Sequence, residues 1–302
     1  MNLRSLLALS LILPATVTLA ADGTFEKTLS LNGAAILSIS TGAGYIHVYS
    51  GSGNQIHITG HVHSNPGLFG SDADQRVKQI VASPPITQSG NIVTAGPSHA
   101  DSDLFHNISI DYDVTTPGST TLTARTGSGS LEIGGILGKV TGESGSGSIK
   151  AENISGDAHL TTGSGSIRAT NVHGPANLQT GSGQLELSVS APGDIKAQTG
   201  SGSIHIDGIS GGLRAGAGSG SIDVGGNPTS EWRVETGSGS IHLRPAPDAH
   251  FNFNAETGSG TIHLDHPIVM QGSLNKHHVA GTVNGGGPTL RASTGSGSIT
   301  VH

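Results

Sequence analysis

Short runs of alternating apolar and polar residues recur along most of the chain, and a Gly-Ser-Gly turn precedes many of them. In one such run Leu131 and Ile133 flank the polar Glu132, which is the period-two pattern of a β-strand. A second alternating pair, such as Ala158 and Leu160, leads into the next turn. No part of this repeat has the period of a helix. The pattern therefore predicts an all-β protein.

The Gly-Ser-Gly turn returns at a nearly constant interval. Its first glycines are Gly127, Gly145, Gly163, Gly181, Gly200, Gly218, Gly237, Gly258 and Gly295. The intervals are 18 or 19 residues until the last two, of 21 and 37, and we interpret the last as two coils with one degraded motif. A unit this short cannot bury its own apolar face, so it must stack on its neighbours. The sequence predicts a single-stranded parallel β-solenoid (β-helix) of 18–19 residues per coil, its handedness left open with right-handed preferred.

Stacking places equivalent residues of neighbouring coils about 4.8 Å apart. Ile167 is then expected between Ile149 and Leu185 in an aliphatic interior, and Arg168 is expected outside. By the same parity, the threonine before each turn should point inward, with its hydroxyl bonded within the stack of turns. Glycine suits these corners because a Cβ would clash there. The inward threonines are Thr126, Thr162, Thr180, Thr199, Thr236, Thr257 and Thr294.

The N-terminal residues 1–20 have the composition of a secretory signal. Arg4 supplies a positive charge, the run from Leu6 to Leu13 is apolar, and small residues precede Ala20. The alternative is a membrane anchor, but the apolar run is short for a bilayer. The sequence therefore predicts a cleaved signal peptide and export.

Residues 21–120 depart from the regular repeat, and we expect them to form an N-terminal cap and irregular first coils. Within them, residues 71–82 fit either a short helix or a loop insertion, and residues 91–97 fit a strand. The cap is expected to shield the open end of the sheet stack. Residues 121–302 are expected to form the regular solenoid. Its large side chains, which should fill widened coils, are Trp232, Phe251 and Phe253.

Composition narrows the chemistry that the chain can perform. Glycine makes up 48 of 302 residues and aromatic residues only 3%, so the interior must be thin. Without Arg4 the chain has 13 basic and 21 acidic residues, a net charge of −8, so nucleic acid is not an expected partner. There is no cysteine. That excludes disulfides, thiol catalysis, cysteine-ligated zinc and lipid attachment at a cysteine.

One outward residue per coil forms a row along the solenoid. In sequence order this row is Glu132, Lys150, Arg168, Glu186, His205, Asp223, His242, His263 and Thr300. Opposite charges tend to be neighbours, which favours a solvated face with compatible stacking. The alternative is a metal site made by His242 and His263 with Asp223 nearby, since imidazole and carboxylate suit zinc or copper. These three are weak metal candidates, and the sequence predicts no catalytic residue, cofactor or required metal.

Two other groups of residues have spacings that merit attention. Asp111 and Asp113 flank Tyr112 on an expected strand, so they share a face, as a glycoside hydrolase requires of its two carboxylates. No basic side chain is fixed beside them by the motif. Among the 16 histidines, two close pairs are interpreted as neutral surface residues rather than metal ligands: His61 with His63, and His277 with His278.

Two longer segments carry a resemblance to a known family. The lead-in ISIDYDVTTPGSTTLTARTGSGSLEI and the closing GTVNGGGPTLRASTGSGSITV, with the reiterated TGSGSI between them, resemble the bacterial "putative adhesin" family, domain of unknown function 4097. The resemblance covers roughly Ala35 to His302. It implies an exported or envelope-associated β-solenoid and carries over no catalytic or binding residues.

The favoured function is that of an exported, non-enzymatic protein of the cell envelope or surface, with an adhesin-like or scaffolding role. The location is expected to be the periplasm, the outer envelope or outside the cell, and the partners are unknown, with glycans or envelope components as candidates. The alternative is a carbohydrate-binding or carbohydrate-active β-helix protein. An ice-binding surface is disfavoured because the regular threonines are expected to point inward.

Overall fold

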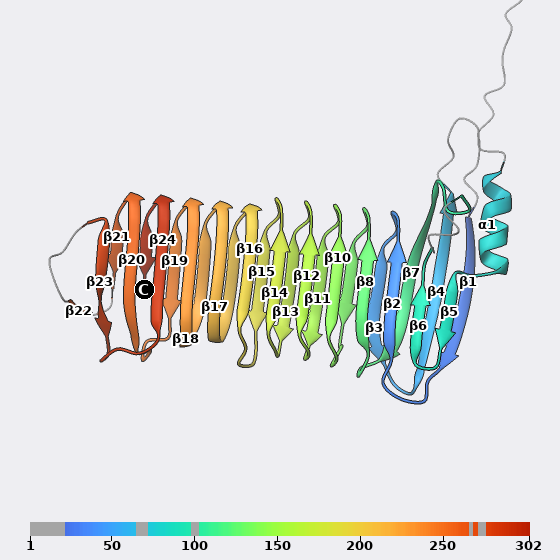
Figure 1. The fold of residues 1–302 in the computed structure, drawn as a ribbon, viewed down its shortest axis with the longest axis horizontal. Helices are drawn as coiled ribbons and strands as arrows, with labels where there is room; N and C mark the ends of the chain where they lie inside the picture. The colour runs from blue at the N-terminus through green and yellow to red at the C-terminus, as the bar shows by residue number, and fades with distance from the viewer. Residues whose placement is uncertain (1–21, 65–71, 98–102, 266–267, 271–275) are drawn as a thin grey trace, which may run out of the picture.

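The computed structural model describes residues 22–64, 72–97, 103–265, 268–270 and 276–302, and it shows a long rod of stacked coils (Figure 1). The expected signal segment, residues 1–20, lies outside the described residues. Each regular coil contributes one strand to each of two sheets. We call the sheet whose strands follow the Gly-Ser-Gly corner the first sheet, and the sheet whose strands lead into it the second sheet. The predicted all-β parallel solenoid is confirmed.

The first sheet runs the length of the rod. Its first two pairings, β1 with β4 and β4 with β7, are antiparallel, and all later pairings are parallel. In spatial order its strands are β1 (Asp22–Ser30), β4 (Gln55–Ser64), β7 (Ile108–Pro117), β3 (Ile46–Gly51), β9 (Leu131–Gly134), β11 (Ile149–Ile154), β13 (Ile167–Val172), β15 (Leu185–Val189), the first parts of β17 (Ile204–Ser219) and β18 (Ile222–Ser238), β19 (Ile241–Pro245), β25 (Ile299–Val301) and β21 (Ile262–Leu264).

The second sheet faces the first across the interior. Its outermost pairs, β5 with β6 at one end and β20 with β23 and β23 with β22 at the other, are antiparallel. In spatial order its strands are β5 (Ile86–Ser89), β6 (Ile92–Ala95), β2 (Ile36–Thr41), β8 (Thr121–Thr126), β10 (Val140–Ser144), β12 (Ala158–Thr162), β14 (Ala176–Thr180), β16 (Ile195–Ser201), the later parts of β17 and β18, β24 (Thr289–Ser296), β20 (Phe251–Ser259), β23 (His278–Val283) and β22 (Ile268–Met270).

The interior is a continuous apolar stack, with the parity expected from the sequence. Ile167 is 1% exposed and lies in register between Ile149 and Leu185. Trp232 is fully buried, and its indole N–H donates a 2.9 Å hydrogen bond to the carbonyl of Gly211. The two phenylalanines that were expected inside, Phe251 and Phe253, are buried as well.

Each corner is held by the hydroxyl that precedes it. The Thr180 hydroxyl donates to the carbonyl of Gly165 in the preceding coil at 2.8 Å, and it accepts the N–H of Gly183 in its own coil at 3.1 Å. Where serine replaces threonine, at Ser144, both bonds are kept. The expected inward threonines are all buried, and the hydroxyl of each donates to a glycine carbonyl of a neighbouring coil, which confirms that they bond within the stack of turns.

The N-terminal end is closed by antiparallel strands and by the helix α1 (Ala73–Ala82). Of the two alternatives for residues 71–82, the structure therefore shows the short helix and not the loop insertion. Its apolar side chains Val77 and Ile80 are buried, and the helix lies against β1 and β4 at one end of the rod (Figure 1). The expected strand within residues 91–97 is β6. These elements lie together at the N-terminal end of the two sheets.

The C-terminal end does not follow sequence order, which corrects one prediction. The 37-residue interval does not contain two stacked coils. Instead, β23 runs antiparallel to β20, and the chain then returns to insert β24 and β25 between earlier strands. β24 pairs with β18 on one side and β20 on the other, and β25 likewise separates β19 from β21. The last coil in sequence is therefore not the last coil in space.

Candidate functional site

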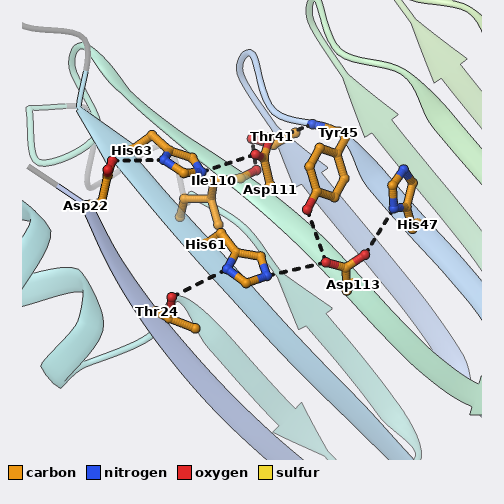
Figure 2. Close-up of polar contacts among 10 residues, drawn as sticks. All are labelled: Asp22, Thr24, Thr41, Tyr45, His47, His61, His63, Ile110, Asp111 and Asp113. Atoms are coloured by element: carbon orange, nitrogen blue, oxygen red, sulfur yellow. Dashed lines mark hydrogen bonds and ion pairs between the residues drawn. The ribbon is translucent and has the colours of Figure 1, made fainter. Parts of the chain in front are cut away.

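Polar chemistry in this protein lies on the outside of the two sheets, because apolar side chains and corner hydroxyls fill the space between them. The richest polar cluster is on the outer face of the first sheet at its N-terminal end (Figure 2). We call it the His–Asp cluster. Its members are Asp22, Tyr45, His47, His61, His63, Asp111 and Asp113.

Strand register brings these residues together from distant parts of the sequence. β4 lies between β1 and β7, which sets His61 directly opposite Asp111, and β3 lies on the other side of β7, which sets His47 opposite Asp113. Alternation along each strand then points all of these side chains to the same side. The sequence prediction that Asp111 and Asp113 share a face is confirmed, as Figure 2 shows.

The two central carboxylates are fully engaged. For Asp113, His47 Nδ1 lies 3.0 Å from Oδ1, and His61 Nε2 lies 3.4 Å from Oδ2. For Asp111, His63 Nε2 lies 3.2 Å from Oδ2, while Oδ1 accepts a backbone N–H at 2.9 Å. All four carboxylate oxygens therefore have a partner within the cluster. The Asp113 side chain is still 44% exposed, so these contacts engage its oxygens without closing the cluster to solvent.

Tyr45 links the two carboxylates. Its backbone N–H is the donor to Asp111, and its hydroxyl donates a 3.1 Å hydrogen bond to Asp113 Oδ2. The ring stacks on His47, with centroids 4.2 Å apart. Burial, followed by the negative charge of Asp113 and this hydrogen bond, raises the pKa of Tyr45 from 10.0 to about 12. The phenol is therefore held as a proton donor to the carboxylate.

Sequence reasoning missed most of this cluster. It identified the two aspartates but assigned them no basic neighbour, whereas three histidines face them. The available signal was weak, because His47 and the pair His61 and His63 are outward by parity on their own strands. What could not be deduced was that β4 turns back antiparallel to lie beside β7.

The three weak metal candidates are not brought together. Asp223 and His242 are neighbours in register, but Thr300 of the inserted strand β25 lies between His242 and His263. The expected outward row is wrong at this point, since it placed Thr300 after His263. Over the described ranges, no group of three or more His, Asp or Glu side chains is arranged to hold a metal ion.

Asp223 belongs to a different polar group that the sequence did not indicate. Arg244, from β19, reaches back over two coils and contacts Asp223 at 2.7 Å and Asp207 at 3.0 Å. His205 Nε2 lies 2.8 Å from the same Asp207. This group is an exposed ion-pair network, of a kind that adds little stability to a β-sheet surface.

The remaining histidine pair lies at the opposite end of the rod from the His–Asp cluster. His278 begins β23, opposite Glu256 of β20, and His277 precedes it. The two histidine pairs therefore cannot act together. Among the residues that the structure describes, no helix has the length and apolar character to cross a membrane.

Three comparisons relate this chain to known proteins. A family model described as Toastrack DUF4097 matches residues 47–302. A search of curated proteins found no match. Among solved structures, a protein described as a "putative adhesin" from Bacteroides fragilis is 10% identical, with a TM-score of 0.42 over 93% of this chain and 97% of that chain. A "putative cell adhesion protein" from Clostridium sporogenes is 13% identical, with a TM-score of 0.23 over 93% and 98%.

Proposed function

The chain belongs to the Toastrack DUF4097 family, and from this premise we propose that it is an exported, non-enzymatic protein of the cell envelope or cell surface with an adhesin-like or scaffolding role. Residues 1–20 act as its signal, residues 21–120 as its N-terminal cap and first coils, and residues 121–302 as its rod. The Toastrack domain is a β-solenoid, and the family's description assigns no reaction.

The observation that carries the proposal is the filled interior. From Leu37 in β2 to Val301 in β25, the inward positions are apolar or are corner hydroxyls that donate to the preceding coil. A rod with this interior offers a partner its two outer faces, on which equivalent register positions recur at a spacing of about 4.8 Å. Repeated weak contacts along such a face add up through multivalency, which is how adhesion and scaffolding surfaces gain strength.

The competing function is a carbohydrate-active enzyme that uses Asp111 and Asp113. The partners of their four carboxylate oxygens argue against it, because hydrolysis needs one carboxylic acid and one free carboxylate facing the sugar. Hydrolysis of any polysaccharide that disappears in Asp111→Asn, with the fold intact, would replace our proposal with this one.

Localisation of the full chain provides the test. We expect the mature protein to begin at Ala21 by mass spectrometry, and a C-terminal tag to be accessible to antibody or protease on intact cells. Cells that carry the gene should bind glycans, matrix or neighbouring cells better than a deletion strain does. A chain that keeps residues 1–20 and stays in the cytoplasm would overturn the proposal.

A further inference from the structure

A row of positive side chains lies on the outer face of the second sheet. Lys196, Arg214, Arg233 and Arg291 occupy one register position on β16, β17, β18 and β24, which are consecutive neighbours in the sheet. All four are exposed. We call them the cationic row. Neighbouring strands are about 4.8 Å apart, so like charges stand directly opposite one another, an arrangement that destabilises a sheet.

The row differs from the outward row of the first sheet. There, two positive side chains stand directly opposite each other at Lys150 and Arg168, but Glu186 follows and forms a 2.7 Å ion pair with Arg168. Within the cationic row, Arg233 pairs with Glu235 on its own strand at 2.8 Å, and Arg291 lies 3.7 Å from Glu231. The side chains of Lys196 and Arg214 have neither an ion pair nor a hydrogen bond to any residue that the structure describes. Their charges are left for a partner.

A groove accompanies this row. It has a volume of about 820 Å³, lies on the outside of the second sheet, and is lined by Lys196, Arg214 and Arg233 among others. The same register position continues along the groove with other hydrogen-bonding side chains, at Asn177 of β14, His159 of β12 and Thr141 of β10. The groove therefore runs along the rod axis, across the strands, and passes from Thr, His and Asn side chains to Lys and Arg side chains.

We propose that this groove binds a linear polysaccharide that carries carboxylate groups, which deepens the proposed function by naming a partner class and rests on it. Hydroxyl groups of the sugars meet the neutral polar positions, and the carboxylates meet the free charges of Lys196 and Arg214. A pyranose unit is about as long as the step between coils, so successive sugars meet successive strands. Arginine suits a carboxylate because its guanidinium can bind both oxygens.

The borders of the groove favour a sparsely charged polymer over nucleic acid. Three carboxylates line one edge of the groove: Asp157 and Asp194, which directly precede β12 and β16, and Glu231, which lies within β18. Duplex DNA carries a phosphate charge every ~1.7 Å, which would bring some of its phosphates against these carboxylates. A polysaccharide presents hydroxyl groups between its charges, and those hydroxyls can donate to the acidic edge. The net charge of the whole chain, −7, likewise disfavours a dense polyanion.

The test measures binding of the purified full chain to immobilised polygalacturonate, with neutral pullulan and duplex DNA as the other ligands. We expect binding to polygalacturonate that weakens in about 0.5 M NaCl because salt screens exposed charges, and no binding to pullulan. The double variant Lys196→Gln/Arg214→Gln should lose at least about tenfold in affinity. The matched control Arg168→Gln, on the first sheet, should bind like the wild type. Thermal melts of both variants establish that they are folded.

Several outcomes separate this inference from the proposed function. Equal binding of polygalacturonate by the wild type and a folded double variant would overturn the proposal that the groove binds it. Duplex DNA that binds as tightly as polygalacturonate and displaces it would also overturn that proposal. If the double variant reaches the cell surface and still supports adhesion, the proposed function stands and the groove does not. If the chain never leaves the cytoplasm, the proposed function fails, and binding by the purified protein still decides whether the groove exists.

Discussion

The hydroxyl of Thr180 donates a 2.8 Å hydrogen bond to the carbonyl of Gly165, which belongs to the preceding coil. The same oxygen accepts an N–H from its own corner, so one side chain joins two coils and closes one turn. This arrangement explains why a hydroxyl residue precedes nearly every Gly-Ser-Gly. The repeated motif is therefore a corner that is hydrogen-bonded both within its own coil and to the preceding coil.

Thr180→Ala should destabilise the rod. It leaves a buried N–H and a buried carbonyl without their partner, which costs about 1–3 kcal/mol. The converse change is available at Ala217, which occupies the same inward position between Thr199 and Thr236. Ala217→Thr supplies the missing donor to the preceding coil and should stabilise by about 0.5–1.5 kcal/mol. Urea unfolding of both variants checks this, and a destabilised Ala217→Thr would contradict it.

Gly165→Ala should be severely destabilising. A Cβ at this position would lie 2.1 Å from the carbonyl oxygen of Gly147 in the preceding coil, where the contacting atoms are backbone and cannot move aside. We expect a loss above about 3 kcal/mol, at the upper end for overpacking. Gly216 is the control, because a Cβ there meets nothing within 4 Å. Gly216→Ala should range from neutral to about 1 kcal/mol stabilising.

The inward stack should matter more than the outward row. Ile167→Ala removes buried methyl groups from a position 1% exposed and should cost about 2–5 kcal/mol. Arg168→Ala, one residue later, removes a pair in which the arginine side chain is 60% exposed and should change stability by less than about 1 kcal/mol. Denaturant melts compare the two. A larger loss of stability for Arg168→Ala than for Ile167→Ala would mean that the assignment of inward and outward positions is wrong by one residue.

The tyrosines should ionise late in an alkaline titration. Tyr45 and Tyr49 both have a pKa raised from 10.0 to about 12, and burial raises the pKa of Tyr112 as well. Because the folded state holds these protons more tightly than the unfolded state, their contribution to stability is complete below pH 10 and is lost as the pH rises through about 12. Tyrosinate absorbance against pH measures this.

Asp113→Asn provides a specific check on that titration. It should lower the pKa of Tyr45 toward 10 without reaching it, because burial is the largest cause of the rise and Asp113 comes second. Tyr49 should change less, since its hydrogen bond to Glu132 is its largest cause. Measuring in a Tyr49→Phe/Tyr112→Phe background isolates Tyr45, since the chain has three tyrosines. A pKa of Tyr45 unaffected by Asp113→Asn would contradict the contact between them.

Engineered cysteines can test the inserted strand, since the chain has none of its own. His242→Cys with Thr300→Cys places two thiols on adjacent coils, about 4.8 Å apart, within the reach of a disulfide. His242→Cys with His263→Cys places them two coils apart and should not cross-link. Mild oxidation followed by mass spectrometry distinguishes the pairs. A cross-link between positions 242 and 263, and none between 242 and 300, would mean that the C-terminal coils stack in the order of the sequence.

Periodicity was sufficient to predict the middle of the rod. Each coil there has the same length and lies on the coil before it, so parity alone put Ile167 inside and Arg168 outside. The ends were not predictable in this way. Nothing in the local sequence around Thr289 distinguishes a strand that extends the stack from one that inserts into it, because its TGSGS corner fits either neighbour.

The candidate site escaped prediction for the same reason. The His–Asp cluster depends on β4 running antiparallel between β1 and β7, and His61 is separated from Asp113 by a long irregular segment. The cationic row was equally hidden. Lys196, Arg214 and Arg233 recur at near-repeat spacing, but Arg291 joins them only because β24 is inserted beside β18.

Interleaving at the C-terminal end determines where this rod can change its length. Coils from β10 to β16 contact only the coil before and the coil after, so duplicating or deleting one 18-residue unit leaves each remaining coil with a neighbour of the same shape. The coil of β20 and β21 rests on strands that come later in the chain, so a duplication there separates partners that need each other. Longer and shorter relatives are therefore expected to differ in the number of middle coils. Such a change alters the length of the rod and leaves the strand pairing at both ends unchanged.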